Sequence, residues 1–281
     1  MTPRRGGVFR NLLRIGVEPT RVERWMLGSF FFVLLLGAYF AASAARHRDN
    51  PADQVMPTFS QLADGARRSA FERDRDGELR LWVDTAASAR RFAVSIAIIF
   101  LAVPLGVAMG TFPYVEALFA RFLVFFDKIP ALSVLPILFV VFGLDEFSKI
   151  ALIVLGVFPT VALDAYLRAK ATPRERIIKA KTLGASELEV AARVVFPGVF
   201  PYTLDTLRLN LKAIMLLLIA GESLAATVGL GYRIFVVRRY LAMDIIIPYV
   251  VWMTGLLFAA DWVLREAVER PRRFQWVKNP L

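Results

Sequence analysis

Cysteine is absent from this 281-residue sequence, and histidine occurs once, as His47. The lack of thiols excludes disulfide bonds, thiolate metal sites and cysteine nucleophiles. A single imidazole excludes a metal site built from several histidines. A membrane-embedded enzyme needs a nucleophile with its base, or a metal cluster. These absences therefore disfavour an enzyme, and no catalytic or metal site is expected in this chain.

Long apolar runs are abundant instead. Hydrophobic residues make up 57% of the chain, and the mean hydropathy is +0.54. The uncharged runs from Trp25 to Ala45 and from Phe92 to Val115 can each cross a hydrocarbon core of about 30 Å at about 1.5 Å per residue. The first run is too long for the apolar core of a signal peptide and has no clear cleavage site. We therefore expect an all-α integral membrane protein, not a soluble protein with two buried helices.

About six transmembrane helices are expected, one over 25–45 and five in a core over 86–267. The core spans are predicted at about 88–110, 122–143, 148–167, 202–224 and 245–265. Between the last two spans, an amphipathic connection is expected to contain Gly229 and Gly231 as helix breakers.

Prolines are expected to shape the second and third spans. Pro104 is predicted to bend the second span, and Pro113 to end it before a short link over 114–121. Pro130 and Pro136 fall inside the third span. Proline is tolerated there, because neighbouring helices can satisfy the carbonyl groups that it frees.

The formal net charge of +11 raises the possibility of nucleic-acid binding, but the basic residues gather beside the apolar runs. They lie in the N-terminal segment 1–24, in the polar segment 168–197 and around the C-terminal tail 268–281. The members at the two chain ends are Arg4, Arg5, Arg10, Arg14, Arg21, Arg24, Arg265, Arg270, Arg272, Arg273 and Lys278. Cations beside apolar spans stay in the cytoplasm, so we expect no nucleic-acid partner. Both termini and 168–197 are predicted to be cytoplasmic, and the polar segment 46–85 external, with a short amphipathic helix near 57–71.

The segment 168–197 has the pattern of two capped helices. Thr172 with Glu175, and Ser186 with Glu189, have the spacing of capping boxes. Pro173 is expected at the first helical position. Gly184 between the two boxes can end the first helix in the left-handed conformation. The pattern predicts a helix–glycine–helix elbow.

The second helix of the elbow is expected to stop at Pro197. Its apolar stripe is predicted from residues at i, i+3, i+4 and i+7, namely Leu188, Ala191, Ala192 and Val195. Such an elbow is suited to docking in a groove of a partner. An amphipathic connector that lies on lipid headgroups remains an open alternative.

The same segment resembles the EAA loop of ABC importer permeases. The stretch Ile178-Lys179-Ala180, three residues, Gly184, nine residues and Val194-Val195-Phe196-Pro197 has the spacing, the glycine and the proline of that loop. Ile178 and Lys179 stand where the family has Glu and Ala. The resemblance therefore supports the elbow, but not an ion pair from the family glutamate.

Further landmarks resemble the nitrate/sulfonate/taurine-type branch of these permeases. They are Ile129-Pro130, Pro136, Phe142-Gly143, Ala220-Gly221-Glu222 and Val228-Gly229-Leu230-Gly231-Tyr232. The resemblance covers about 80–277 and implies a type I ABC importer permease fold with a cytoplasmic coupling helix, in a bacterial inner membrane. This branch handles small anions, sulfonates, vitamin precursors and aromatic acids.

The resemblance also implies partners. Two permease copies, most simply a homodimer, would enclose a path in the lipid bilayer, two cytoplasmic ATPase subunits would drive it, and an external binding protein would deliver the substrate. The chain has no Gly-x-x-x-x-Gly-Lys loop, so ATP and Mg²⁺ belong on the ATPase and no cofactor is expected here. The residues expected to contact the ATPase are Lys179, Ala180, Leu183, Gly184, Ala185, Ser186 and Glu187.

Ionisable residues inside the predicted spans are candidates for the translocation path, since such residues usually face a cavity or a partner. The candidates are Lys128, which is expected near the cytoplasmic end of the third span, Arg208, Lys212 and Glu222. Pro130, which is not ionisable, is a further candidate for the path. The cations would form a lining suited to an anion. The alternative is local pairing of Lys128 with Asp127 and of Arg208 with Asp205, with Lys212 snorkelling to the interface. For Glu222, a helix-end or gate hydrogen bond is the alternative, and a secondary transporter without an ATPase is the alternative for the whole chain.

The predicted topology can be tested with single cysteines, because the chain has none of its own. An impermeant thiol reagent added to intact cells should label a cysteine within 46–85 and should not label one beside Gly184. Labelling beside Gly184 from outside would contradict the six-span orientation.

Overall fold

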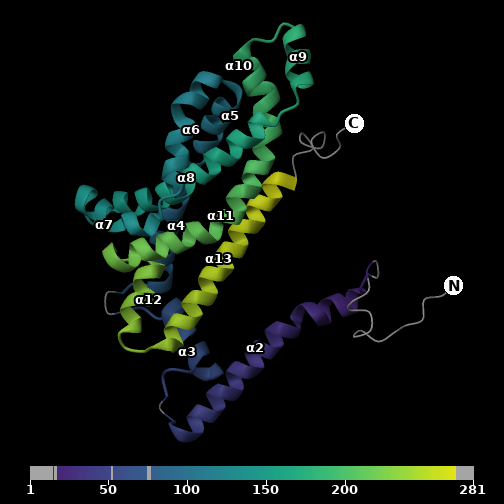
Figure 1. The fold of residues 1–281 in the computed structure, drawn as a ribbon. Helices are drawn as coiled ribbons and strands as arrows, with labels where there is room; N and C mark the ends of the chain where they lie inside the picture. Colours follow the sequence, from purple (N-terminus) through teal and green to yellow (C-terminus); the bar gives the residue numbers. More distant parts are fainter. Residues whose placement is uncertain (1–14, 16–17, 52, 75–76, 270–281) are drawn as a thin grey trace, which may run out of the picture.

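The computed structural model describes residues 15, 18–51, 53–74 and 77–269, and within these ranges it contains helices and no strand (Figure 1). The first helices are α2 (Arg21–Asp49), α3 (Phe59–Phe71), α4 (Arg80–Ile99), α5 (Ala102–Thr111), α6 (Pro113–Asp127), α7 (Ala131–Phe142) and α8 (Glu146–Lys170). They are followed by α9 (Arg174–Thr182), α10 (Glu187–Val190), the π-helical turn η1 (Ala191–Val195), α11 (Phe196–Ala225), α12 (Leu230–Arg238) and α13 (Met243–Glu269). The predicted basic residues Arg4, Arg5, Arg10, Arg14, Arg270, Arg272, Arg273 and Lys278 lie outside the described residues.

The helices confirm an all-α protein with several membrane spans. Four described segments are long and apolar enough to cross a membrane: α2, α4 with α5, α8, and α13. Two bent pairs, α6 with α7 and Glu187–Ala225 with α12, bring the number to six if each pair is one span. The predicted number of six is therefore the upper end of what the structure supports.

The third predicted span is wrong as a single helix. Instead of one helix over 122–143, α6 and α7 meet at an angle of 102°. Pro130 has no N–H and disfavours a helical conformation at the residue before it, so α6 ends in tight bonds from Lys128 and Ile129 to the carbonyls three residues earlier. The predicted link over 114–121 is also wrong, because Pro113 is the first residue of α6, a position that proline favours.

The second span is bent as predicted, and it starts earlier. The break between α4 and α5 falls at Phe100 and Leu101, within the turn that precedes Pro104, where the ring displaces the carbonyl four residues earlier. Helix α4 begins at Arg80, so it includes residues predicted to belong to the external polar segment.

The core is built around α8, which packs against α4, α5, α6, α7 and α11 (Figure 1). Its inner face carries small and β-branched side chains, and Leu152, Ile153, Val157 and Val161 are fully buried or nearly so. In lipid, helices associate through close packing of such side chains. Helix α8 thus fixes the relative positions of the bent pair α6–α7 and of α11.

The polar segment after α2 folds back onto the end of the core at which α13 begins. The predicted amphipathic helix near 57–71 is confirmed as α3, which packs against α13. Arg68 of α3 pairs with Asp244 of α13 at 2.6 Å. On the other side, Arg46 of α2 donates to Asp53 at 2.6 Å, and this bond lowers the pKa of the Asp53 carboxyl.

Candidate functional site

The elbow between α9 and α11 has the predicted glycine geometry. Gly184 has φ +88°, which confirms the left-handed conformation. Its N–H bonds to the carbonyl of Lys181 and the N–H of Ala185 to that of Ala180, at 2.9 and 3.1 Å. This pair of bonds is the Schellman motif, which satisfies the last carbonyls of a helix. Lys181 and Glu187 form an ion pair at 2.6 Å that joins the two arms.

One of the two predicted capping boxes forms. Ser186 caps α10, and its hydroxyl and the Glu189 carboxylate each accept from the backbone of the other. The box at Thr172 is wrong, because Pro173 itself occupies the N-cap of α9 and no side chain caps this helix. Thr172 is thereby one residue too far from the helix start for its hydroxyl to reach the N–H that a cap must satisfy.

The second arm of the elbow does not stop at Pro197. A π-helical turn, in which the N–H of Phe196 bonds to the carbonyl of Ala191, joins α10 directly to α11. The wider turn lets the chain accommodate a proline that lacks an N–H and would clash with the carbonyl four residues earlier. The elbow is therefore one end of a helical segment that continues to Ala225.

The π-helical turn also changes which residues are buried, so the predicted apolar stripe is only half right. Ala191 and Val195 are buried, together with Val190 and Val199, against α5 and α8. Ala192 and Leu188 are exposed.

The exposed surface of the elbow contains large apolar side chains. Leu188 is 73% exposed, Leu183 is 81% exposed and Ile178 is also exposed. The predicted contact residues Lys179, Ser186 and Glu187 are exposed as well, whereas Ala180 and Ala185 are half-buried. Apolar side chains beside charged ones on a rigid turn form a surface that fits a protein partner or the headgroups of a membrane.

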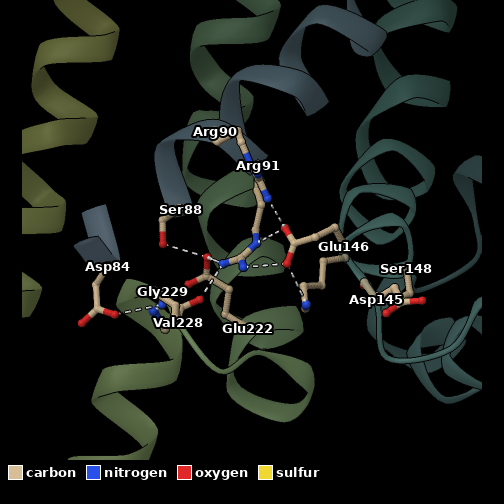
Figure 2. Close-up of polar contacts among 12 residues, drawn as sticks. Asp84, Ser88, Arg90, Arg91, Asp145, Glu146, Ser148, Glu222, Val228 and Gly229 are labelled. Atoms are coloured by element: carbon tan, nitrogen blue, oxygen red, sulfur yellow. Dashed lines mark hydrogen bonds and ion pairs between the residues drawn. The ribbon is translucent and has the colours of Figure 1, made fainter. Parts of the chain in front are cut away.

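A second polar region lies inside the helix bundle and is centred on Arg91 of α4 (Figure 2). The side chain is 5% exposed. Its Nε and Nη2 donate to the two carboxylate oxygens of Glu146, both at 2.7 Å. Its Nη1 donates to Glu222 Oε1 at 2.7 Å and to the carbonyl of Val228 at 2.8 Å. One guanidinium therefore contacts the first residue of α8, the last turn of α11 and the turn before α12.

Glu222 is 0% exposed and is surrounded by donors. Besides Arg91, it accepts from Ser88 Oγ at 2.7 Å and from the N–H of Gly231 at 2.8 Å. A buried carboxylate is tolerated only when it is paired and hydrogen-bonded. The predicted alternative for Glu222, a hydrogen-bonding group at a helix end, agrees with these contacts.

The carboxylate packs directly against the backbone of the turn before α12. Gly229 has φ +144°, and a Cβ there would lie 2.6 Å from Glu222 Oε2. The N–H groups of Gly229 and Leu230 are held by Asp84 and Ser88, at 3.0 and 2.9 Å. Glycine is required here by both the backbone conformation and the lack of space.

Sequence reasoning missed most of this network, including Arg91 and Glu146. The remaining members are Asp84, Ser88, Lys149, Arg233 and Tyr249, of which Asp84 accepts from Arg233 Nε at 2.8 Å and from the Tyr249 hydroxyl at 3.2 Å. A signal was present: residues 84, 88 and 91 have the i, i+4, i+7 spacing of one helix face. The predicted span begins at about residue 88 and leaves out Asp84, so it does not contain the whole polar face, whereas α4 begins at Arg80.

The structure pairs two of the three predicted path cations with carboxylates. Arg208 is paired with Asp205 at 2.9 Å and with both oxygens of Asp261 on α13, at 3.0 and 3.2 Å. Lys128 pairs with Asp127 at 3.1 Å. The predicted local pairs are thus confirmed for both cations.

Lys128 and Pro130 lie at the break between α6 and α7. The straight span on which the predicted position of Lys128 rested is therefore wrong, and its place near the cytoplasmic side stays a prediction. Asp127 next to it accepts from Thr160, a residue in the middle of α8, at 2.7 Å.

Lys212 differs from the other candidates. It is exposed on α11, on the same face as the exposed Leu209 and Leu216. Within the described ranges, no ion pair is formed by Lys212. A free ammonium on an apolar helix face is costly in lipid unless the face meets water, a partner or a ligand.

Comparison with known proteins agrees with the fold. Residues 102–271 match the family described as "Binding-protein-dependent transport system inner membrane component". The chain is 34% identical over 191 residues to the taurine transport system permease protein TauC of Escherichia coli (strain K12), covering 68% of this chain and 70% of the relative. It is 33% identical over 198 residues to a probable ABC transporter permease protein of Brucella abortus (strain 2308), covering 66% of this chain and 78% of the relative. It is also 27% identical over 143 residues to the putative aliphatic sulfonates transport permease protein SsuC of E. coli (strain K12), covering 51% of this chain and 54% of the relative.

The packing of Gly229 against Glu222 predicts the effect of adding a methyl group there. Gly229→Ala should destabilise the protein by about 1–3 kcal/mol, from the strained backbone and the displaced carboxylate. Thermal unfolding in detergent measures this change. Gly198→Ala is the control, because a Cβ at Gly198 in α11 meets nothing within 4 Å. Equal melting temperatures for the two variants would contradict the described contact.

Proposed function

The chain belongs to the family of binding-protein-dependent transport system inner membrane components, and we propose that it is the permease subunit of an ATP-driven importer for a small anionic solute. The substrate is proposed to be a sulfonate such as taurine or a related small anion or organic acid. An external binding protein delivers it, two copies of this chain enclose the path, and two cytoplasmic ABC ATPases, which hold ATP and Mg²⁺, drive the transport cycle.

The observation that carries this proposal is the exposed elbow. Its two arms are fixed relative to each other by the Schellman motif, the Ser186 cap and the Lys181–Glu187 ion pair. Leu183 and Leu188 stay exposed on it. A secondary transporter has no use for a rigid apolar turn outside the helix bundle, whereas an ATPase needs one to act on.

The anionic substrate is supported by two independent observations. Two of the relatives named above are a taurine permease and a putative permease for aliphatic sulfonates, and the sulfonate group of such substrates is an anion at neutral pH. Lys212 is an exposed cation on α11. In a homodimer the two-fold axis would double that charge along the path.

Replacement of Gly184 by valine tests the coupling role of the elbow. A β-branched residue at φ +88° costs about 1–2 kcal/mol, and nothing lies within 4 Å of the added Cβ. The strain should therefore change the angle of the elbow without disturbing the bundle. Purified Gly184→Val in liposomes with its partners should insert normally and lose ATPase binding or substrate-stimulated hydrolysis.

The matched control is Gly184→Asn, because asparagine tolerates the left-handed conformation. It should retain most of the coupled transport. Wild-type transport by Gly184→Val would rule out this role for the loop, and equal loss in both variants would show that the backbone conformation is not the cause.

Replacement of Lys212 by methionine tests the anionic path. Removing one charge worth about 1 kcal/mol should raise the KM for uptake of the anion by roughly fivefold. Basal ATP hydrolysis and assembly should not change. Lys212→Arg, which keeps the charge, should retain uptake, and an unchanged KM for Lys212→Met would assign Lys212 to the interface with lipid headgroups.

A further inference from the structure

The elbow and the buried network lie at the two ends of one helical segment. From Glu187 the helix passes through η1 into α11 and ends at Ala225. Glu222 is in its last turn and is held by Arg91 of α4 at 2.7 Å. A displacement applied at the elbow therefore reaches the network through a continuous backbone.

At the network, two breaks in the bundle meet. One is the turn 143–145 between α7 and α8, followed directly by Glu146. The other is the turn 226–229 between α11 and α12, whose Val228 carbonyl accepts from Arg91. The same guanidinium holds both sides, as Figure 2 shows. Lys149 of α8 lies against Gly221 of α11, with 3.6 Å between the Lys149 side chain and a Cβ built at Gly221.

The arrangement depends on the shape of arginine. The planar guanidinium donates from one edge to Glu146 and from the other side to Glu222 and Val228. A lysine has the same charge, but its three donors sit on one nitrogen, and it cannot form the bidentate bond to one carboxylate while it bridges to another group.

We propose that Arg91 is a positioning residue for transport that clamps the turn 143–145 to the turn 226–229, so that the two turns move as one body when α11 is displaced at the elbow. The clamp itself stands on the geometry, and its role in transport rests on the proposed function. Helix α7 leads into the first turn and α12 follows the second. The clamp therefore fixes the distance between the end of α7 and the start of α12.

Spin labels test the clamp without any partner. Cysteines introduced at the exposed residues Leu144 and Thr227 can be labelled specifically, because the chain has none of its own. Dipolar electron paramagnetic resonance on the purified chain should give a narrow distance distribution. In an Arg91→Lys background the distribution should broaden, while the melting temperature stays above the assay temperature.

Transport assays test the consequence. With the ATPase and the binding protein in liposomes, Arg91→Lys should hydrolyse ATP while the amount of solute taken up per ATP falls several-fold. The matched control is Arg90→Lys. Arg90 is 69% exposed and contacts Glu146 at 3.2 Å, and Glu146 keeps both bonds from Arg91 in this variant. Arg90→Lys should match the wild type in both readouts.

If Arg91→Lys does not fold, Glu146→Ala replaces it. This change removes the α8 half of the clamp at a partly exposed side chain and should broaden the distance distribution in the same way.

A narrow distribution in a folded clamp variant overturns the clamp. A broad distribution with wild-type uptake per ATP overturns its role in transport. If the wild-type complex itself takes up no anion, the proposed function fails, and the spin-label distances still decide the clamp.

Discussion

The guanidinium of Arg91 satisfies a requirement that every broken helix in a membrane must meet. A helix that ends inside an apolar environment exposes carbonyl and N–H groups that lipid cannot bind. Here the turn between α11 and α12 presents such groups, and side chains of α4 satisfy them. Arg91 donates to the carbonyl of Val228, and the N–H groups of Gly229 and Leu230 donate to Asp84 and Ser88. The carboxylates of Glu222, which is buried, and of Glu146, which is partly exposed, oppose the charges of Arg91 and Lys149, so the cluster carries matched charge. Without that match, burial of any one member would cost several kcal/mol. The bend between α11 and α12 depends on this compensation.

The same constraint explains why the backbone and polar groups are satisfied differently at the two ends of the helical segment from Glu187 to Ala225. At the elbow, water can satisfy the backbone, so local devices suffice: a glycine at positive φ, a serine cap and an exposed ion pair. Glu222 is fully buried, and the chain satisfies it with groups that are distant in sequence, Ser88 and Arg91 of α4. Under the proposed function, the solvated end must fit a partner and the buried end must hold two turns together. The helix between them is unbroken through the π-helical turn, so a displacement at one end can be transmitted to the other.

This difference also separates what could be predicted from the sequence from what could not. Local patterns were sufficient to predict the long apolar helices, the positive φ of Gly184 and the Ser186 cap. Each of these features depends on residues that are close together in the sequence. The 102° bend between α6 and α7 was missed, since a proline inside a span permits either a kink or a break, and neighbouring helices decide which. The pairing of Arg208 with Asp261 and of Arg91 with Glu146 joins residues more than fifty positions apart. Spacing along one helix can indicate a polar face, but not the partner that faces it.

The ion pairs of Lys128 and Arg208 leave one residue, Lys212, to support an anionic substrate on electrostatic grounds. Sequence reasoning offered three basic residues as a lining, and two of them are neutralised by carboxylates, Lys128 by Asp127 and Arg208 by Asp205 and Asp261. A neutralised pair contributes little field beyond its own length, whereas an unpaired charge in a medium of low dielectric acts over several ångströms. Lys212 is the candidate without an ion pair in the part of the chain that the structure describes, and it lies on a face that no helix of the same chain covers. Under the proposed homodimer, selectivity for an anion would then come from two symmetry-related ammonium groups rather than from a basic lining. A site of that kind favours a solute with a compact anionic group, which a sulfonate provides, over a solute of the same size that has none.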